Sequence, residues 1–458
     1  MSFDMHGWTR IEYEGTPIYV QQETSTWFVP NKAGDALLRH LGRREGLNGD
    51  LAAHRFIERL PDTPPLPYPG RASALKLDSL KELWFHVTNR CNLKCSHCLF
   101  ASSPEDRTEL SGDQIRRLAH EAHALGCRVF VFTGGEPFIH EEFEQTVRAM
   151  LAYEATHVVV LTNGMQLSTL LGHSTWPLDR FHLQISVDGL QKRHDQIRGK
   201  GTFQRLIKNL TWLQAEQIPY TISMCVNTGN VCDMPEIVDF AADVGAGNVH
   251  FMWYFIRGRG QAEQFALPEE IFQGLLRASK RAKERGIEID NIEALRTQVF
   301  APSGTIHDGT TTAWESLAVG PDGRLYPSAA LVSIPELATD LGDGLEQAWK
   351  ESPVLNQIRQ ATAARLSSPL RFLLGGGDTD HSYVHGHAVM GKDPYTPLYE
   401  KMALWLIAEE ARRQEETEAP QLRLKMGDVL ESCGAHGRVA LVHSNCLLAT
   451  AQENSLAV

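Results

Sequence analysis

The sequence lacks the features of a membrane or secreted protein. No apolar run approaches the roughly 20 residues needed to cross a bilayer. The first residues, Met1-Ser2-Phe3-Asp4-Met5-His6, are not the basic-then-apolar start of a signal peptide. We therefore expect a cytoplasmic protein without membrane contacts, whose eight cysteines stay reduced unless they bind a metal.

An excess of positive charge is also missing. The 458 residues include 44 Lys and Arg against 56 Asp and Glu, which gives a formal net charge of −12. This balance argues against nucleic acid as a partner, because phosphate backbones are bound chiefly by Lys and Arg. With 42% apolar and 22% charged residues, the composition is typical of a globular protein of two or three domains.

Three of the few cysteines stand close together. Cys91, Cys95 and Cys98 follow the spacing C-x3-C-x2-C directly after the apolar run 83–87. Three thiolates on one loop can hold three corners of a cubane iron-sulfur cluster and leave its fourth iron open. Structural zinc is the alternative, but it usually takes two separated cysteine pairs, and no second pair lies nearby. His97 could supply a fourth zinc ligand, although its place between two of the cysteines would strain the loop.

A second motif follows farther along the chain. Thr133-Gly134-Gly135-Glu136-Pro137 comes directly after the apolar run 129–132. In this order and spacing, the two motifs resemble the radical S-adenosylmethionine (radical SAM) superfamily, whose cluster loop follows the first barrel strand and whose GGEP segment follows the second. The resemblance implies an α/β fold with a partial (β/α)6 barrel in place of a closed barrel of eight strands.

The resemblance also implies the chemistry of the site. A 4Fe-4S cluster on Cys91, Cys95 and Cys98 would chelate S-adenosylmethionine and cleave it to methionine and a 5′-deoxyadenosyl radical, which abstracts hydrogen from a substrate. An external one-electron donor such as flavodoxin or ferredoxin would reduce the cluster. The cofactor-binding residues predicted from the family pattern are Gly134, Gly135, Glu136, Asn163, Ser186, Asp188, Arg198 and His97. For Asp188, a plain turn with Gly189 is the alternative interpretation.

The middle of the chain, residues 81–300, alternates apolar strands with helical segments. This pattern predicts a parallel sheet covered by helices. Each strand ends in a polar or Gly-rich segment, so we expect the site at the carboxyl ends of the strands. The six expected strands are 83–87, 129–132, 157–161, 181–185, 220–227 and 249–255.

Residues 1–60 predict a small separate domain, followed by a Pro-rich linker over 61–80. The expected strands 8–13, 17–20 and 26–29 precede a helix over 33–41. A β-hairpin followed by helices resembles the peptide-recognition domains found with enzymes that modify ribosomally made peptides. Such a domain captures a leader peptide by adding it as a strand to an exposed sheet edge. A capping element without a ligand is the alternative.

Residues 301–395 resemble a SPASM domain, the auxiliary-cluster module of many peptide-modifying radical SAM enzymes. Ser328, however, stands where the family has a cysteine, and 374–378 replaces the family's C-x-G-G-C segment. No cysteine lies between Cys232 and Cys433, so auxiliary clusters would have no thiolates. We predict a degenerate SPASM-like domain and one cluster, with about four irons per chain.

The last segment, residues 396–458, predicts an amphipathic helix over 397–418 and a strand over 439–443. Cys433 and Cys446 in this tail are candidate catalytic thiols, because one of them could return a hydrogen atom to a substrate radical. A buried cysteine that serves only as a small hydrophobe is the alternative for each. A second metal site among the Asp and His residues of 378–387 is a further, less favoured interpretation.

Three functions remain open at this point. The first is a radical SAM enzyme that alters a ribosomally made peptide by epimerisation or cross-linking; the absence of auxiliary clusters favours a redox-neutral outcome such as epimerisation. The second is a radical SAM enzyme acting on a small molecule, such as a tetrapyrrole or a natural-product precursor. The third is a non-catalytic iron-sulfur scaffold or sensor.

Overall fold

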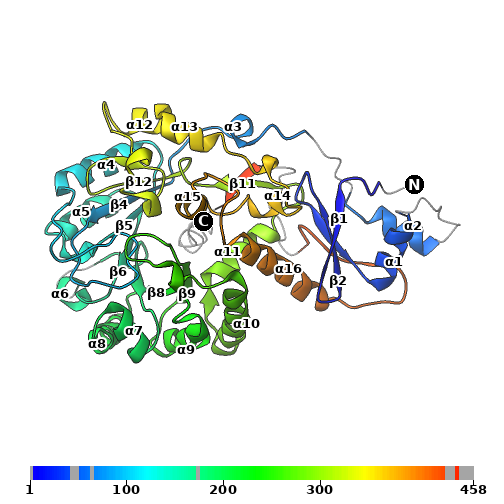
Figure 1. The fold of residues 1–458 in the computed structure, drawn as a ribbon, viewed down its shortest axis with the longest axis horizontal. Helices are drawn as coiled ribbons and strands as arrows, with labels where there is room; N and C mark the ends of the chain where they lie inside the picture. The colour runs from blue at the N-terminus through cyan, green and yellow to red at the C-terminus, as the bar shows by residue number, and fades with distance from the viewer. Residues whose placement is uncertain (1–3, 42–50, 62–66, 172–175, 429–438, 443–458) are drawn as a thin grey trace.

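The computed structural model describes residues 4–41, 51–61, 67–171, 176–428 and 439–442. A large parallel sheet with helices around it lies at one end of the molecule, and a small sheet formed by the N-terminal strands lies at the other (Figure 1). The helix α16 (Thr396–Arg412) runs between the two parts.

The large sheet has nine strands in the order β10-β9-β8-β7-β6-β5-β4-β12-β13. Its six central strands are all parallel and correspond to the six strands expected from the sequence, which confirms the partial barrel. These strands are β4 (Glu82–Thr88), β5 (Val129–Gly134), β6 (His157–Thr162), β7 (Phe181–Ser186), β8 (Tyr220–Val226) and β9 (Asn248–Trp253). The short β10 (Glu288–Ile289) continues the parallel order beside β9.

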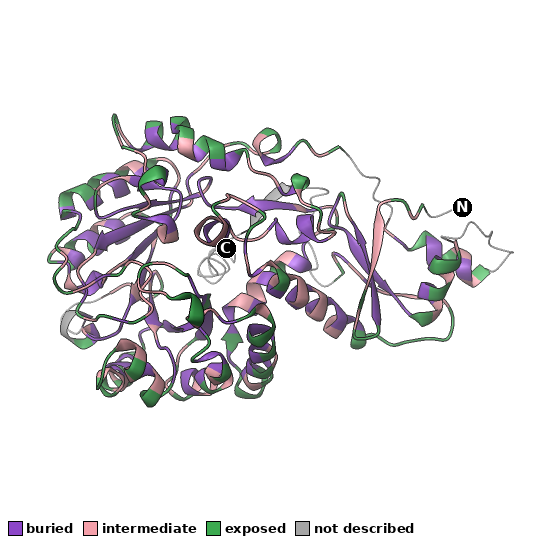
Figure 2. Cartoon of the chain, viewed as in Figure 1, coloured by how far each residue is buried: buried purple, intermediate pink, exposed green. Residues whose placement is uncertain are grey.

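Helices cover the outer face of this sheet, and most residues of the strands are buried (Figure 2). The first helix begins with the capping box expected at Ser111, whose side chain accepts the N–H of Gln114. The surrounding helices are α4 (Gly112–Ala124), α5 (Phe143–Leu151), α6 (Leu167–Leu171), α7 (Gln191–Arg198), α8 (Thr202–Ala215), α9 (Met234–Asp243), α10 (Pro268–Arg285) and α11 (Asp290–Val299).

The region predicted to be SPASM-like joins the barrel sheet. Strand β12 (Ser316–Val319) lies parallel to β4, and β13 (Leu325–Tyr326) pairs with β12 in the antiparallel sense. Backbone hydrogen bonds therefore connect this region to β4, the strand that precedes the cluster loop. Its other elements are β11 (Ile306–Thr310), α12 (Leu345–Glu351), α13 (Pro353–Arg359), α14 (Arg371–Leu374) and α15 (Thr379–Gly386).

The small sheet has the order β1-β2-β3-β14. Its N-terminal part matches the prediction: β1 (Trp8–Tyr13), β2 (Thr16–Gln21), β3 (Trp27–Pro30), α1 (Lys32–Leu41) and α2 (Leu51–Glu58). The sequence did not predict the fourth strand, β14 (Leu422–Lys425), which pairs antiparallel with β3. Leu424 is 2% exposed, so the chain's own C-terminal part fills this edge. Among the described strands of this sheet, β1 and β14 are the edge strands, each bonded on one side only.

Two further elements differ from or extend the expectation. Helix α16 ends at Arg412, earlier than predicted, because the chain turns there toward β14, and Arg423 donates to the carbonyl of Ala411. Strand β15 (Val439–Val442) pairs in parallel with β11. The remaining short helices are α3 (Arg71–Ala74) and the 3-10 turns Pro137–Ile139, Val231–Asp233, Ala262–Gln264, Ala329–Leu331, Pro335–Leu337 and Ala363–Arg365.

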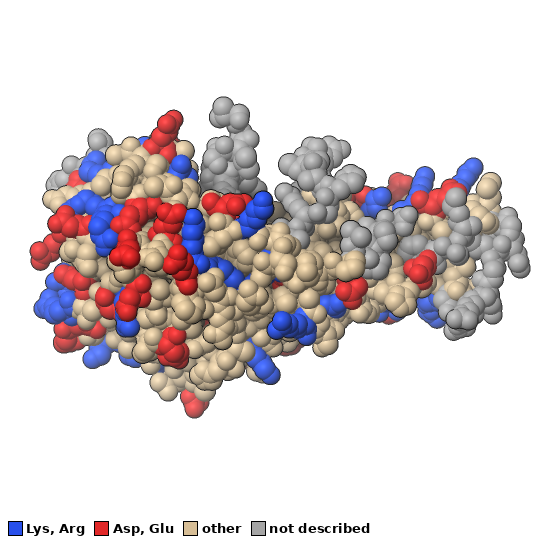
Figure 3. Space-filling view, turned by 90° about the horizontal axis from the view of Figure 1, so that it is seen from above, with Lys and Arg blue, Asp and Glu red and all other residues tan. Residues whose placement is uncertain are grey.

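Charged side chains are mixed on the face shown in Figure 3, where Lys and Arg lie among Asp and Glu, chiefly over the barrel. Within the described residues, no helix combines the length and the apolar composition that a bilayer span requires. The domain boundaries given above from the sequence stay predictions.

Candidate functional site

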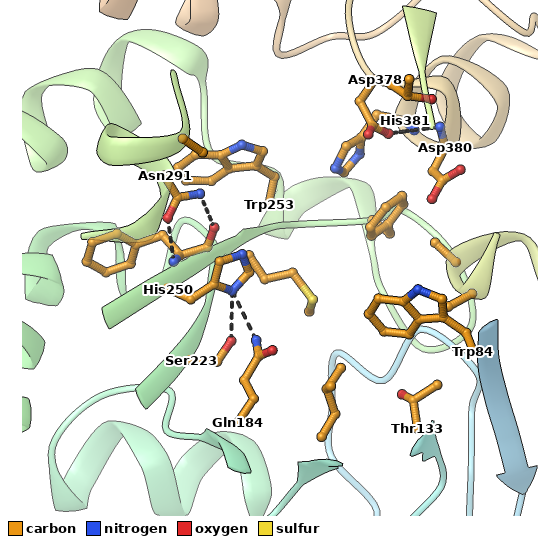
Figure 4. A pocket seen from close by; sticks show the side chains of 18 of the residues that line it. Trp84, Thr133, Gln184, Ser223, His250, Trp253, Asn291, Asp378, Asp380 and His381 are labelled. Atoms are coloured by element: carbon orange, nitrogen blue, oxygen red, sulfur yellow. Dashed lines mark hydrogen bonds between the residues drawn. The ribbon is translucent and has the colours of Figure 1, made fainter. Parts of the chain in front are cut away.

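A cavity of about 970 Å³ opens at the carboxyl ends of the parallel strands. We call one side of it the cluster wall; it contains Cys91, Cys95, Cys98, Gly134, Gly135, Asn163, Ser186, Arg198 and His97. We call the side formed by Gly377, Asp378, Asp380 and His381 the C-terminal wall. Figure 4 shows Asp378, Asp380 and His381 at one end of the cavity, with Gln184, Ser223 and Thr133 toward the other. The cavity therefore combines residues from two predicted domains.

The cluster loop follows β4 and surrounds the first cysteine with donors. The backbone N–H of Leu93 lies 3.4 Å from the Cys91 sulfur, and Nδ2 of Asn163 lies 3.8 Å from it. Burial raises the pKa of the Cys91 thiol to about 12. A thiolate at this position therefore needs nearby positive charge, which the irons of a cluster provide.

The arrangement of the cysteines suits a cluster better than a single zinc ion. Within the described residues, no three His, Cys, Asp or Glu side chains converge closely enough to hold one metal ion. A cubane does not require such convergence, because each cysteine binds a different iron. His97 is engaged elsewhere, since its Nε2 lies 2.8 Å from Oδ2 of Asp188. The same result disfavours a metal site at Asp378, Asp380 and His381.

The two glycines of the GGEP segment bring it against the cluster loop. A Cβ on Gly135 would lie 2.1 Å from the carbonyl oxygen of Arg90, and one on Gly134 would lie 2.5 Å from Cδ2 of His86. The Gly135 N–H donates to the carbonyl of Thr88 at 2.7 Å. Only glycine permits this approach, and the backbone of this segment thereby lines the cavity without a side chain in front of it.

Glu136 is buried behind this backbone and does not line the cavity. Its carboxylate accepts hydrogen bonds from the Thr162 hydroxyl and from the backbone N–H of Asn163, each at 2.8 Å. Burial raises the pKa of Glu136 to about 7. The Asn163 side chain lines the cavity and donates to Asn92 Oδ1 at 2.7 Å. The observed contacts of Glu136 are thus those of a residue that positions Asn163, and its predicted contact with a cofactor stays a prediction.

Asp188 is also fully buried, and both of its oxygens have partners. Oδ2 accepts from Arg198 Nε at 2.6 Å and lies 2.8 Å from His97, while Oδ1 accepts the N–H of Cys225. Burial alone would raise the pKa of Asp188, but the Arg198 guanidinium and then His97 outweigh it and hold this pKa well below the usual range. A plain turn with Gly189, the alternative interpretation of Asp188, does not account for these contacts with Arg198, His97 and Cys225. Asp188 orients Arg198 and His97, which line the cavity, while its own contact with a cofactor stays a prediction.

Three polar side chains that were not predicted from the sequence meet on three neighbouring strands. Gln184 on β7 and Ser223 on β8 contact Nδ1 of His250 on β9, at 3.1 and 3.2 Å (Figure 4). Burial lowers the pKa of His250 to about 4, so its ring is neutral at pH 7. A polar residue within an otherwise apolar strand was the available signal, because such a residue usually points into a functional interior.

Arg259, from the segment after β9, is a second residue that the sequence analysis missed. Its Nε donates to the carbonyl of Cys95 at 2.7 Å, and its backbone N–H donates to that of Cys98 at 2.9 Å. The last strand of the barrel thereby fixes the loop that follows the first. The two candidate catalytic thiols, Cys433 and Cys446, lie outside the described residues, so their role stays a prediction.

In the comparison with known proteins, residues 85–241 match the Radical SAM superfamily model. The "Antilisterial bacteriocin subtilosin biosynthesis protein AlbA" of Bacillus subtilis is 27% identical over 292 residues, which cover 62% of each chain. The "Sporulation killing factor maturation protein SkfB" of the same organism is 31% identical over 207 residues, 44% of this chain and 49% of that protein. The "Fe-coproporphyrin III synthase" of Methanosarcina barkeri is 27% identical over 209 residues, with coverages of 44% and 52%. The matches thus span about half to three fifths of these relatives.

Solved structures share the fold. "Native anSMEcpe with bound AdoMet and Cp18Cys peptide" superposes with a TM-score of 0.58 at 16% identity, covering 72% of this chain and 97% of that one. "Streptococcus suis SuiB bound to precursor peptide SuiA" gives a TM-score of 0.55 at 14% identity, with coverages of 81% and 96%. The expected radical SAM fold, with additions on both sides of the barrel, is confirmed.

Proposed function

We propose that this chain, whose residues 85–241 form a radical SAM domain, is an enzyme that abstracts hydrogen from a ribosomally made peptide. The family to which this domain belongs uses a 4Fe-4S cluster and S-adenosylmethionine. The observation that carries the proposal is that Cys91, Cys95 and Cys98 line the same cavity as Gly135 and Ser186.

The residues of the cluster wall have distinct tasks in this proposal. Cys91, Cys95 and Cys98 would hold the cluster, which would supply the one electron for cleavage of S-adenosylmethionine to methionine and a 5′-deoxyadenosyl radical. The backbone of Gly134 and Gly135 leaves room for the methionine part of that cofactor.

Polar side chains complete the cofactor site. Asn163, Ser186 and Arg198 present an amide, a hydroxyl and a guanidinium to the cavity. Arg198 is held in place by Asp188, so its charge faces the cavity from a fixed position. The aromatic residues Trp84 and Phe255 line the same space and limit the access of water to a radical.

A peptide is the favoured substrate because of the relatives and the small N-terminal sheet. One relative is named for the biosynthesis of a bacteriocin and another for the maturation of a sporulation killing factor, and two related structures are titled with bound peptides. A leader peptide adds as a strand at a free sheet edge. Because β14 already pairs with β3, the edge of β3 is covered, and we propose that a leader adds at β1, which with β14 is one of the two edge strands of the described sheet. Epimerisation is the favoured outcome and cross-linking the alternative.

A small molecule is the second candidate substrate. "Fe-coproporphyrin III synthase" and "AdoMet-dependent heme synthase" of Methanosarcina barkeri match 44% and 43% of this chain, at 27% and 26% identity. A tetrapyrrole is therefore the alternative to test beside peptides.

Anaerobic reconstitution tests the proposal. Full-length protein with iron, sulfide, S-adenosylmethionine and a strong reductant should form 5′-deoxyadenosine, whereas the triple variant Cys91→Ala, Cys95→Ala, Cys98→Ala should not. Cys232→Ala is the matched control, because Cys232 is exposed and does not line the cavity. Equal 5′-deoxyadenosine formation by the triple variant, or none by the wild type, would contradict the proposal. Deuterated candidate peptides and iron coproporphyrin then distinguish the substrates, since only the true substrate transfers label to 5′-deoxyadenosine.

A further inference from the structure

The C-terminal wall contains a buried polar pair that the cofactor chemistry does not use. Asp380 and His381 lie at the start of α15, and both line the cavity. Asp380 is 7% exposed and His381 is 5% exposed. The Asp378 carboxylate accepts the backbone N–H groups of both residues, at 2.8 and 2.9 Å, and so fixes the first turn of the helix.

Ser328 holds the Asp380 carboxyl in place. Its hydroxyl donates to Oδ1 of Asp380 at 2.7 Å, and Ser328 itself is 5% exposed. Ser328 occupies the position at which the SPASM pattern has a cysteine, and Asp378 ends the segment that replaces C-x-G-G-C. The Ser328 hydrogen bond therefore reaches Asp380, two residues beyond the segment 374–378.

The Asp380 carboxyl has no ion-pair partner within the described residues, although the charge of Arg257 favours its ionised form. The ion pairs in this part of the chain include neither Asp378 nor Asp380. The guanidinium of Arg257 donates instead to the carbonyls of Ala330 and Val332, both at 2.5 Å. Burial, followed by the proximity of Asp378, raises the pKa of Asp380 well above its usual range. A positive charge on a ligand beside Asp380 would favour the ionised carboxylate and lower its pKa again.

His381 gives a second, independent indication that a ligand binds at this wall. Its Nδ1 is buried without a hydrogen-bond partner among the described residues. The ring stacks on Phe255, with centroids 3.9 Å apart and an angle of 10°, and packs edge-on against Tyr395 at 4.8 Å. Figure 4 shows the ring extending from the start of α15 into the cavity toward Trp253. An imidazole fixed in this way, on the residue that follows Asp380 and lining the same cavity, is a preformed acceptor that lacks a donor.

We propose that Asp380 and His381 form a substrate subsite that binds a cationic nitrogen group, an ammonium or a guanidinium, carried by the peptide. Asp380 accepts a charge-assisted hydrogen bond from the cation, and His381 accepts a second hydrogen bond through a ring nitrogen. Ser328 is a positioning residue for Asp380. This inference rests on the proposed peptide substrate and adds which chemical group of that peptide the C-terminal wall selects.

Binding of short probes to the reconstituted full-length protein tests the subsite. The probes are acetylated, amidated Gly-Gly-X-Gly-Gly pentapeptides in which X is arginine, lysine, norleucine or glutamate, titrated anaerobically by calorimetry. The arginine and lysine peptides should bind about tenfold more tightly than the norleucine peptide, because a buried charge-assisted hydrogen bond is lost in the latter. The glutamate peptide should bind most weakly.

Variants test whether the preference for the arginine and lysine peptides arises at Asp380. Asp380→Asn should bind the arginine and norleucine peptides equally, and it keeps an oxygen for Ser328, so its iron content should match the wild type. Ser328→Ala should show a smaller preference than the wild type. Asp343→Asn is the matched control, an exposed carboxyl of the same region that does not line the cavity, and it should keep the full preference.

Equal binding of all four probes by the wild type would overturn the subsite, and so would a cation preference that survives in Asp380→Asn. The measurement involves no turnover. Failure of the subsite is therefore distinguishable from failure of the proposed function, which would appear as absence of 5′-deoxyadenosine.

Discussion

The two walls of the cavity each depend on a buried aspartate, and these aspartates have opposite surroundings. Asp188, behind the cluster wall, contacts the cation Arg198 and the ring of His97. Asp380, on the C-terminal wall, has a hydroxyl partner in Ser328 and no ion pair in the described chain. The aspartate behind the cluster wall thus has its counter-charge within the protein. The aspartate of the C-terminal wall is a buried carboxyl without an ion-pair partner, which a cationic group of a substrate can supply.

The difference agrees with what each wall has to recognise. The cluster wall resembles a family pattern built around one cofactor set, and its cysteines and glycines have fixed geometric tasks. The C-terminal wall belongs to the region that resembles a SPASM domain, where Ser328, Leu374 and Asp378 stand at the positions of cysteines in the family pattern. We infer that substrate selection resides on the wall that changed, and the following predictions test this contrast.

The largest effect concerns iron. Wild-type protein should bind about four irons per chain, and the triple alanine variant at Cys91, Cys95 and Cys98 should bind none, because the C-terminal wall has no thiolates. Iron and sulfide analysis of the reconstituted proteins measures this. About four irons remaining in the triple variant would show that the second wall also holds a cluster, which would break the comparison.

Gly135→Ala should reduce 5′-deoxyadenosine formation by about 100-fold, since a Cβ would lie 2.1 Å from the Arg90 carbonyl oxygen and displace the cluster wall. Gly247→Ala is the matched control, because the nearest atom to its Cβ, the Tyr220 carbonyl oxygen, lies at 3.7 Å. An unchanged rate in Gly135→Ala would show that the close approach of the two loops is not needed for the chemistry.

Asp188→Asn should destabilise the protein by about 3–5 kcal/mol at pH 7, because it leaves the buried Arg198 without its counter-charge. The folded-state pKa of Asp188 lies below the unfolded value of about 3.9, so its contribution is complete above that pH and is lost as the pH falls. Anaerobic urea unfolding from pH 7 to pH 3 should therefore show the difference from wild type shrinking in acid. A pH-independent difference would exclude the ion pair as its cause.

Asp380→Asn should have the smallest effect on the free energy of unfolding. It should stabilise the protein at pH 7, whereas Asp188→Asn should destabilise it. The folded-state pKa of Asp380 lies above the unfolded value, so the wild type loses stability as the pH rises through about 3.9. The variant should match wild type near pH 3 and exceed its free energy of unfolding by about 1 kcal/mol at pH 7. The same unfolding series measures this. A variant less stable than wild type at pH 7 would indicate that a cation of the protein neutralises Asp380, and the contrast with Asp188 would then be wrong.

Much of the barrel could be predicted because its signals are local. The six strands, the capping box at Ser111 and the C-x3-C-x2-C spacing are all properties of short segments. The family pattern also identified Asn163, Ser186 and Arg198, which the structure brings to one cavity. The pattern could not show that Glu136 and Asp188 act from behind this surface, because a motif gives the identity of a residue but not the partners around its oxygens.

The small sheet shows the opposite case. Its first three strands could be predicted, but a free edge at β3 could not be assumed, because β14 comes from the far end of the chain. Nothing near residues 422–425 indicates a pairing with Trp27–Pro30, and Leu424 becomes a core residue only through that contact. The edges left for a peptide in this sheet are consequently those of β1 and β14.

The sequence by itself determined the succession of the six barrel strands along the chain, the radical SAM motifs and the loss of the auxiliary cysteines, because spacing and periodicity are properties of the linear sequence. Only the tertiary structure decided which carboxyls have counter-charges, which sheet edge is covered and which residues share the cavity. These depend on contacts between segments far apart in sequence, and local preferences carry no information about such contacts.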